Sequence, residues 1–403
     1  MGQQDRFNLI KMWISGVLRT ISSSCLAILP VFFLRNGLTE VQISFYSSLA
    51  QTVNLVVSLS CSGITAYYKD SRKILAVLLF LQGLLSALYA LFGLFSMNLD
   101  VLYICILGIA SLLAVVSALF TIFDYKLPCE IMSMKSYSTH VAYSSLFCGI
   151  VGTGISLVLP VLYRKYSFFT VASACILIAG VTLALSAFVM MWLKPIGESS
   201  VALQNQRPRL NPVKDVLRLL SNRDFRLLFI PNILRGFGSG MLSIISLIAI
   251  RGFSMEDGDV PLITAAANVG VFLSSFLYII LVKRLGIPWT GLVGGILFCL
   301  ICFSSFGNAT TFLAFYTLAQ VGLHLLGNAI PNMIYCSIEP GIISQFQTWR
   351  MILLSLGSAI GTPVYAALLD KVPVIVLFLI SAVAIFLSVL GYYLLYRGKN
   401  VKT

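Results

Sequence analysis

The sequence predicts an all-α polytopic membrane protein whose twelve transmembrane helices form two pseudo-symmetric six-helix bundles. Of the 403 residues, 59% are hydrophobic and only 10% are charged. The mean hydropathy is +0.96. Apolar blocks also recur along the whole chain, each close to the roughly 20 residues that a helix needs to cross a membrane. A water-soluble enzyme is therefore excluded.

Apolar blocks between polar breaks predict the individual helices. In the first half they cover residues 8–34, 41–66, 73–96, 99–123, 140–162 and 168–193. In the second half they cover residues 227–250, 260–282, 287–306, 310–335, 348–369 and 372–396. We therefore expect two helical domains, residues 1–194 and 225–403, joined by a polar linker over residues 195–224.

The net charge of +13 reflects membrane topology and does not indicate a nucleic-acid partner. Lys and Arg fall almost wholly between apolar blocks, and the side of the membrane that is richer in them is normally the cytoplasm. That side holds both termini, the linker and Arg350. The opposite side holds only Arg35, Arg164, Lys165, Arg251 and Lys371. We expect a monomer in the plasma membrane, surrounded by the lipid bilayer, with both termini in the cytoplasm.

The remaining composition gives no sign of catalysis. The nine cysteines are scattered and lie mostly inside apolar blocks, so no disulfide framework is predicted. The chain has no phosphate-cradling loop, no clustered metal ligands and no nucleophile beside a base. We expect no enzyme activity, no cofactor and no metal site.

The two halves carry the same pattern of residues, as parallel repeats of a six-helix unit do. Matched pairs of residues are separated by identical intervals in the two halves: Arg19 to Arg35 and Arg235 to Arg251, then Glu130 to Gly152 and Glu339 to Gly361.

Glycines are clustered in the fifth and eleventh predicted helices, at positions 149, 152, 154, 357 and 361. Small residues let helix backbones approach closely. We therefore expect tight helix contacts at these five positions.

The loop that follows the first helix resembles that of the major facilitator superfamily. A helix end that contains Pro30 leads into Gly37-Leu-Thr-Glu-Val-Gln-Ile43, which is similar to the superfamily pattern Gly-Leu-Ser-x-x-Gln-Ile. The resemblance extends over the whole chain. It implies secondary transport by alternating access.

The loop after the second helix is similar to the superfamily motif G-x-x-x-D-R-x-G-R-K. Gly63 matches the motif's Gly, and Arg72 and Lys73 correspond to its Arg-Lys pair one residue beyond the motif's spacing, whereas Tyr67 and Tyr68 stand where its Asp and Arg belong. The second-half copy keeps Arg284. The resemblance implies gating roles for Arg72, Lys73 and Arg284, in a loop that has lost the acid of the family's ionic latch.

Two arginines, Arg19 and Arg235, lie well inside predicted spans, at matched places in the two halves. A guanidinium at a helix centre costs about 2.5 to 3.5 kcal/mol, and it cannot be neutralised by deprotonation. No Asp or Glu lies in the middle of a span, so we expect no built-in counterion. An anion from outside the protein, such as a carboxylate or a phosphate ester, would complete the site. The arginine pair also resembles that of organophosphate:phosphate antiporters, at these two positions only.

Polar residues beside the arginines extend the predicted substrate-binding set. They occupy the first, second, seventh and tenth helices: Ser23, Asn54, Asn232, Ser239, Asn268, Gln320, His324 and Asn328. Histidine ordinarily titrates near neutrality, so we expect His324 to suit proton coupling, and Asp124 is a candidate inner gate or proton relay. Equally, His324 could be a hydrogen-bonded histidine of the protein core, and Asp124 could simply contact water at a helix end. The arginines would then brace helices through backbone carbonyls or the two helix-two asparagines.

The sequence therefore predicts a secondary active transporter of a small organic anion, coupled to a proton or to a counter-anion. One alternative is an exporter of drugs or natural products, which the 12% aromatic content favours. A second alternative is a transporter-like sensor or lipid-handling protein that turns over no solute.

Overall fold

The computed structural model describes residues 3–61, 64, 68, 70–93, 98–124, 126–131, 134–194, 221, 223–337 and 343–397. These residues form helices, turns and short connections, with no strand among them. The linker predicted over 195–224 lies outside the described residues except for residue 221 and the start of α10.

The first half begins with α1 (Gln3–Leu26) and α2 (Leu29–Arg35), which together make one crossing. Then come α3 (Glu40–Cys61), α4 (Ser71–Leu88) with its 3-10 extension η2 (Tyr89–Gly93), and α5 (Leu99–Asp124). The short α6 (Leu127–Ile131) precedes α7 (Met134–Lys165) and α8 (Phe168–Met191).

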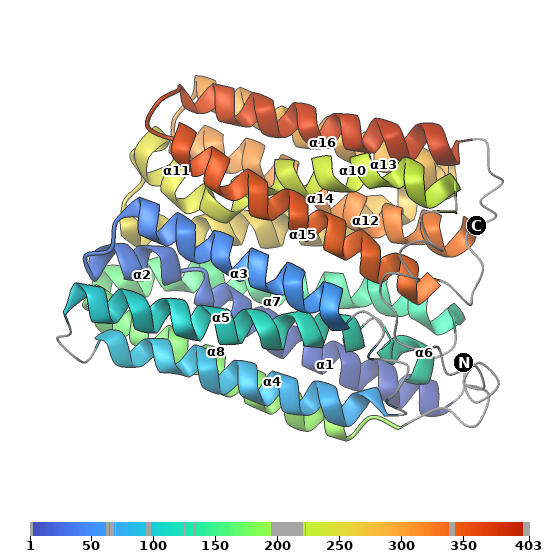
Figure 1. Ribbon diagram of the computed structural model, residues 1–403, viewed down its shortest axis with the longest axis horizontal. Helices are drawn as coiled ribbons and strands as arrows, with labels where there is room; N and C mark the ends of the chain where they lie inside the picture. Colours follow the sequence, from blue (N-terminus) through green and yellow to red (C-terminus); the bar gives the residue numbers. More distant parts are fainter. Residues whose placement is uncertain are drawn as a thin grey trace.

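The second half begins with α10 (Arg223–Gly240), η4 (Met241–Ile244) and α11 (Ile245–Phe253), followed by η5 (Asp257–Asp259) and α12 (Pro261–Leu285). Next are α13 (Ile287–Cys299) with its 3-10 extension η6 (Leu300–Phe306), α14 (Ala309–Ser337), α15 (Ile343–Leu368) and α16 (Val374–Tyr396). The first residues of α1 and the last of α16 lie at the same end of the molecule (Figure 1). We call this the termini end, and the end that carries Arg35 and Arg251 the far end.

Eleven of the described helical segments are long and apolar enough to cross a membrane. The remaining crossing is α3, whose Ser, Gln, Thr and Asn residues lower its hydropathy. It has 22 residues and packs against α5 and α15. Because polar groups at membrane depth are tolerated where they face protein, α3 completes the twelve crossings that the sequence predicts.

The packing of the helices repeats between the halves. α1 packs on α7 and α8 as α10 packs on α15 and α16, and α4 packs on α5 and α8 as α13 packs on α14 and α16. The halves meet through α3 with α15 and through α12 with α7 (Figure 1). These pairs confirm the predicted arrangement of two pseudo-symmetric six-helix bundles.

The interruptions of the helices repeat as well. The first crossing breaks between Leu26 and Leu29, and the seventh breaks at Met241–Ile244, the matched place in the repeat. The third and ninth crossings both end as 3-10 helices. The breaks of the first and seventh crossings come about two turns after Arg19 and Arg235, so the two arginines occupy equivalent places in the two halves.

Close approach at the predicted glycines is confirmed at the interface of α7 and α12. A Cβ added to Gly149 would lie 2.8 Å from the Cβ of Phe272, and one added to Gly152 would lie 2.6 Å from the side chain of Asn268. Gly357 and Gly361 of α15 likewise lie against the backbone of α10. The prediction was wrong for residue 154, where nothing lies within 4 Å of an added Cβ, because that face of α7 meets no neighbour.

The polar contacts that join the halves lie between mid-membrane and the far end. Asn268 Nδ2 donates to Ser24 Oγ at 3.3 Å and to Ser156 Oγ at 3.5 Å. Ser48 Oγ on α3 donates to a backbone carbonyl of α15 at 3.4 Å. At the far end itself, Arg164 pairs with the carboxylate of η5 at 3.1 Å.

Candidate functional site

Arg19 has an acidic partner inside the first half. Its Nη1 lies 3.6 Å from Oδ2 of Asp124, the last residue of α5, and its guanidinium carbon lies 5.3 Å from the ring centre of Phe120. The expectation that neither membrane-depth arginine has a counterion in the protein was therefore wrong for Arg19. Sequence gives the depth of a residue along its own helix, but not the packing that brings the end of α5 to the middle of α1.

The Arg19–Asp124 contact leaves both side chains accessible. They are 29% and 35% exposed, and the distance is longer than that of a hydrogen bond. An exposed ion pair of this kind contributes little to stability. The pair is thus positioned to exchange partners with a solute or a proton.

His140 brings a third helix to this place. The charge of Arg19 acts on His140, which lies in α7. Arg19 of α1 therefore interacts with titratable groups of two other helices, with Asp124 of α5 by direct contact and with His140 of α7 through its charge. The predicted site did not include His140, because its position in the sequence is near the start of a span.

Arg235 occupies the matched place in the second half and is buried, with 8% of its surface exposed. Its charge acts on His324 of α14 and on Tyr392 of α16. Gln320, one turn from His324, is also buried, while Asn328 is half-buried. Of the predicted residues of α14, His324 therefore lies near enough to Arg235 for the arginine's charge to act on its imidazole.

Asn232 contributes to packing. Its Nδ2 donates to the Leu228 carbonyl at 2.7 Å, and its Oδ1 accepts a hydrogen bond from the hydroxyl of Tyr392. Asn232 is 1% exposed and ties α10 to α16. Helical spacing placed it on the face of Arg235, but at this level that face meets α16, so we leave Asn232 out of the proposed site.

The other predicted residues make local or inter-half contacts. Asn54 accepts a hydrogen bond from Ser58 at 3.3 Å, whereas Asn268 bridges the halves through Ser24 and Ser156. Ser23 and Ser239 donate to carbonyls of their own helices, at 3.0 and 2.9 Å. Ser23 is exposed although it lies at membrane depth, which is consistent with a position on a water-accessible face.

The loop before α4 keeps a carboxylate that motif matching missed. Asp70 caps α4 by accepting from the backbone N–H of Arg72, and both guanidinium contacts from Arg72 to Asp70 measure 2.8 Å. The hydrogen bond from Arg72 lowers the pKa of Asp70 below its usual value. Arg72 also donates to the Leu193 carbonyl at the end of α8 at 2.5 Å.

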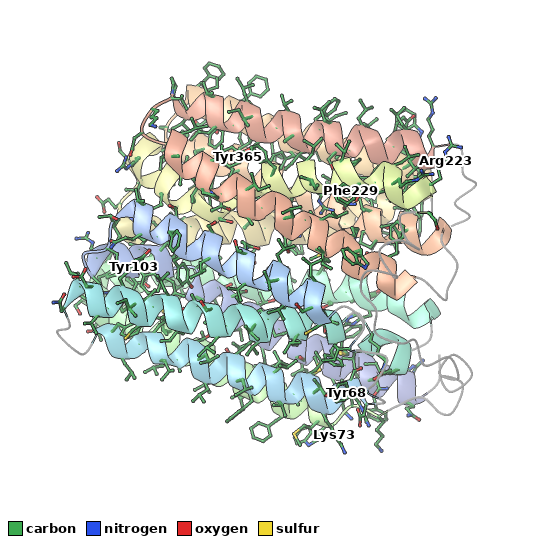
Figure 2. The ribbon with its side chains drawn as sticks, viewed as in Figure 1. Tyr68, Lys73, Tyr103, Arg223, Phe229 and Tyr365 are labelled. Atoms are coloured by element: carbon green, nitrogen blue, oxygen red, sulfur yellow. The ribbon has the colours of Figure 1, made fainter. Side chains whose placement is uncertain are left out.

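The other two residues with a predicted gating role, Lys73 and Arg284, are exposed. Figure 2 shows Lys73 beside Tyr68 at the termini end, on the lower half of the view. Because Lys73 and Arg284 are exposed, both are available for contacts in a different arrangement of the halves.

Arg350 is a buried arginine that the sequence analysis counted with the cytoplasmic charges and left out of the site. Helix α15 begins at Ile343, before the predicted start at residue 348, and this places Arg350 inside the bundle with 5% of its surface exposed. Its Nε donates to Gln347 Oε1 at 2.7 Å, and its charge acts on Tyr392 together with that of Arg235.

No protein-family model and no curated protein sequence matches the chain. Solved structures do match it along nearly its whole length. A D-xylose-proton symporter has a TM-score of 0.69 at 13% identity and covers 99% of this chain and 98% of its own. An outward-facing bacterial homologue of the iron transporter ferroportin has 0.68 at 14%, covering 98% and 100%. The nucleoside transporter NupG has 0.65 at 13%, covering 97% and 100%.

The protein is therefore an integral membrane protein with the fold of major facilitator superfamily transporters. The expected resemblance to that superfamily is confirmed at the level of the fold. The similar structures carry different solutes by name, and identities of this size establish architecture alone.

Proposed function

We propose that the protein is a secondary active transporter that carries a small organic anion by alternating access. A guanidinium at membrane depth on the first helix of each half is the observation that carries this proposal. Arg235 is 8% exposed, and a buried guanidinium forms strong charge-assisted hydrogen bonds with a carboxylate or a phosphate. An anionic solute would accept such bonds during part of the transport cycle.

The two arginines have different roles in this proposal. Arg235, with Gln320, His324 and Asn328 nearby, holds the solute's negative charge. Arg19 pairs with Asp124 at 3.6 Å, and it binds the solute only when this ion pair is broken. Protonation of Asp124 would free Arg19, and this links solute binding to a proton.

The inter-half contacts suit alternating access. Asn268 and the Arg164 ion pair hold the far end together, so the solute path opens toward the termini end. In the opposite state, Arg72, Lys73 and Arg284 would meet partners at the termini end. We place the termini end in the cytoplasm, on the distribution of Lys and Arg.

The test is a thermal-stability screen of the purified protein with small carboxylates and phosphate esters, each beside a neutral and a cationic analogue of matched size. Anions are expected to raise the melting temperature of the wild type, because a ligand that binds only the folded state stabilises it. Arg235→Met should lose this rise, and Arg226→Met, an exposed arginine of the same helix, should keep it. Stabilisation by the cationic analogues, or an unchanged rise in Arg235→Met, would contradict the proposal.

A second candidate is export of amphipathic aromatic compounds. Trp13 on α1 lies with Tyr143 and Phe147 of α7 at ring-centre distances of 5.7 and 5.6 Å. Tyr143 and Phe147 are 49% and 40% exposed, so this aromatic surface is open to a ligand or to lipid. Turnover of cationic dyes that survives both Arg19→Met and Arg235→Met would favour the exporter. Ligand binding without any turnover would favour a sensor.

A further inference from the structure

Arg350 is a buried charge whose described partners are neutral. It is 5% exposed, and it donates to Gln347 Oε1 at 2.7 Å and to Met351 Sδ at 3.6 Å. No described acidic side chain lies within ion-pair distance of it. Arg stays protonated at any physiological pH, so burial of its uncompensated charge is strongly unfavourable.

Gln347 adds a second unused donor at the same place. Its side chain is 1% exposed, and its Nε2 has no hydrogen-bond partner. The Oε1 of the same amide already accepts from Arg350. A buried donor that lacks an acceptor costs about 1 to 3 kcal/mol. Arg350 and Gln347 lie one turn apart on α15. A negatively charged acceptor would therefore compensate the charge of Arg350 and accept a hydrogen bond from Gln347.

Among the described residues, the neighbours of Arg350 and Gln347 supply no negatively charged acceptor. Tyr392 feels the positive charges of both Arg235 and Arg350, and its hydroxyl donates to Asn232. Met333, 1% exposed, precedes Glu339 by the same interval by which Asp124 precedes Glu130. The second half thus has an apolar residue at the place where the first half has the acid that meets Arg19.

We propose that Arg350 and Gln347 hold a small anion inside the second half, where α10, α15 and α16 pack together. The guanidinium and the primary amide lie side by side there, and their N–H donors suit a compact singly charged acceptor. A halide from solution has this chemistry, and so does the carboxylate of an organic solute. The site is distinct from the proposed transport function and does not depend on it.

The experiment measures the melting temperature of the purified full-length protein in detergent at constant ionic strength. Sodium chloride or sodium acetate replaces sodium gluconate, whose anion is much larger than chloride or acetate. A saturable rise on the order of 5 °C is expected. A rise with chloride assigns the site to an inorganic anion, and a rise with acetate alone assigns it to a carboxylate.

Two variants test the residues directly. Gln347→Glu places a carboxylate beside Arg350 and should melt high in gluconate with no further rise. Arg350→Met removes the charge and should also show no rise, whereas Arg226→Met should respond as the wild type does. If Arg350→Met fails to fold, Gln347→Glu still decides the matter.

A wild-type melting temperature that does not respond to either anion would overturn the proposal. So would a full rise in Gln347→Glu. Neither measurement reads transport, so a failure to exchange organic anions in liposomes, with the titration intact, would reject the transport proposal and leave this site in place.

Discussion

Arg19 and Arg235 occupy matched positions in the repeat, but their surroundings differ. Arg19 lies half-exposed beside Asp124, whereas Arg235 is buried near His324 and Tyr392. A half-exposed pair exchanges partners at low cost, and a buried guanidinium does not. We therefore assign anion binding mainly to the second half and coupling mainly to the first.

Removal of the carboxylate that meets Arg19 tests this division of roles. Asp124→Asn is expected to slow anion exchange in proteoliposomes by about tenfold or more, which corresponds to about 1.4 kcal/mol. The reason is that Arg19 would then hold the solute without a competing group to release it. Asp100→Asn, an exposed acid at the other end of α5, is the control and should exchange normally. Equal slowing in both variants would argue against a coupling role.

The Asp70–Arg72 contact makes stability depend on acidity. The folded-state pKa of Asp70 is lowered by the hydrogen bond from Arg72, so the contribution is complete above the unfolded pKa and is lost as pH falls through the folded pKa. Melting temperatures measured downward from about pH 5 should therefore fall less in Arg72→Gln than in the wild type. Lys283→Gln, an exposed lysine elsewhere, should follow the wild type. Parallel curves for all three proteins would show that the pair does not contribute.

At the scale of the elements, the α7–α12 interface tests how tightly the halves fit. Gly149→Ala should lower the unfolding free energy by about 1 to 3 kcal/mol, since the new Cβ would meet the backbone of α12. Gly154→Ala on the same helix meets nothing, so it should be neutral or stabilising by up to about 1 kcal/mol. Thermal melting of both variants provides the comparison. Equal destabilisation would mean that the loss comes from glycine itself and not from the interface.

The transmembrane helices were predictable because hydropathy along the chain identifies them, and this signal does not depend on which helices pack together. Even α3, too polar to qualify by hydropathy, was found from the breaks on either side of it. Contacts between side chains were harder to predict from the sequence. The contact of Asp124 with Arg19 depends on which helices pack together, and the burial of Arg350 beside Gln347 depends on where α15 begins. Asp70 was missed because the superfamily motif fixes the acid at another register.

For the whole molecule, the Arg164 ion pair with η5 is expected to bias the far end toward closure. Arg164→Glu should shift the population toward far-end opening by a factor of a few, because an exposed pair is worth about 1 kcal/mol or less. Arg164 is 74% exposed, which supports the modest size. Distances between spin labels at the far ends of α3 and α15 report the shift. Lys165→Glu, the neighbouring charge reversal, should leave the distances unchanged, and an equal effect there would indicate a nonspecific charge response.

The arrangement of the two six-helix bundles is compatible with the proposed alternating access. Within each bundle, α1 and α10 pack against two long helices, and between the bundles the described polar contacts gather at mid-membrane and at the far end. Rigid halves joined by a few separable contacts are suited to rocking about a central site.

Counterflow in proteoliposomes tests the central claim most directly. A labelled organic anion selected by the stability screen should accumulate against unlabelled anion in the wild type, in Arg226→Met and in Arg6→Met. Arg235→Met and Arg19→Met should each abolish the accumulation, because each removes a guanidinium at membrane depth. Undiminished counterflow in Arg235→Met would contradict the account.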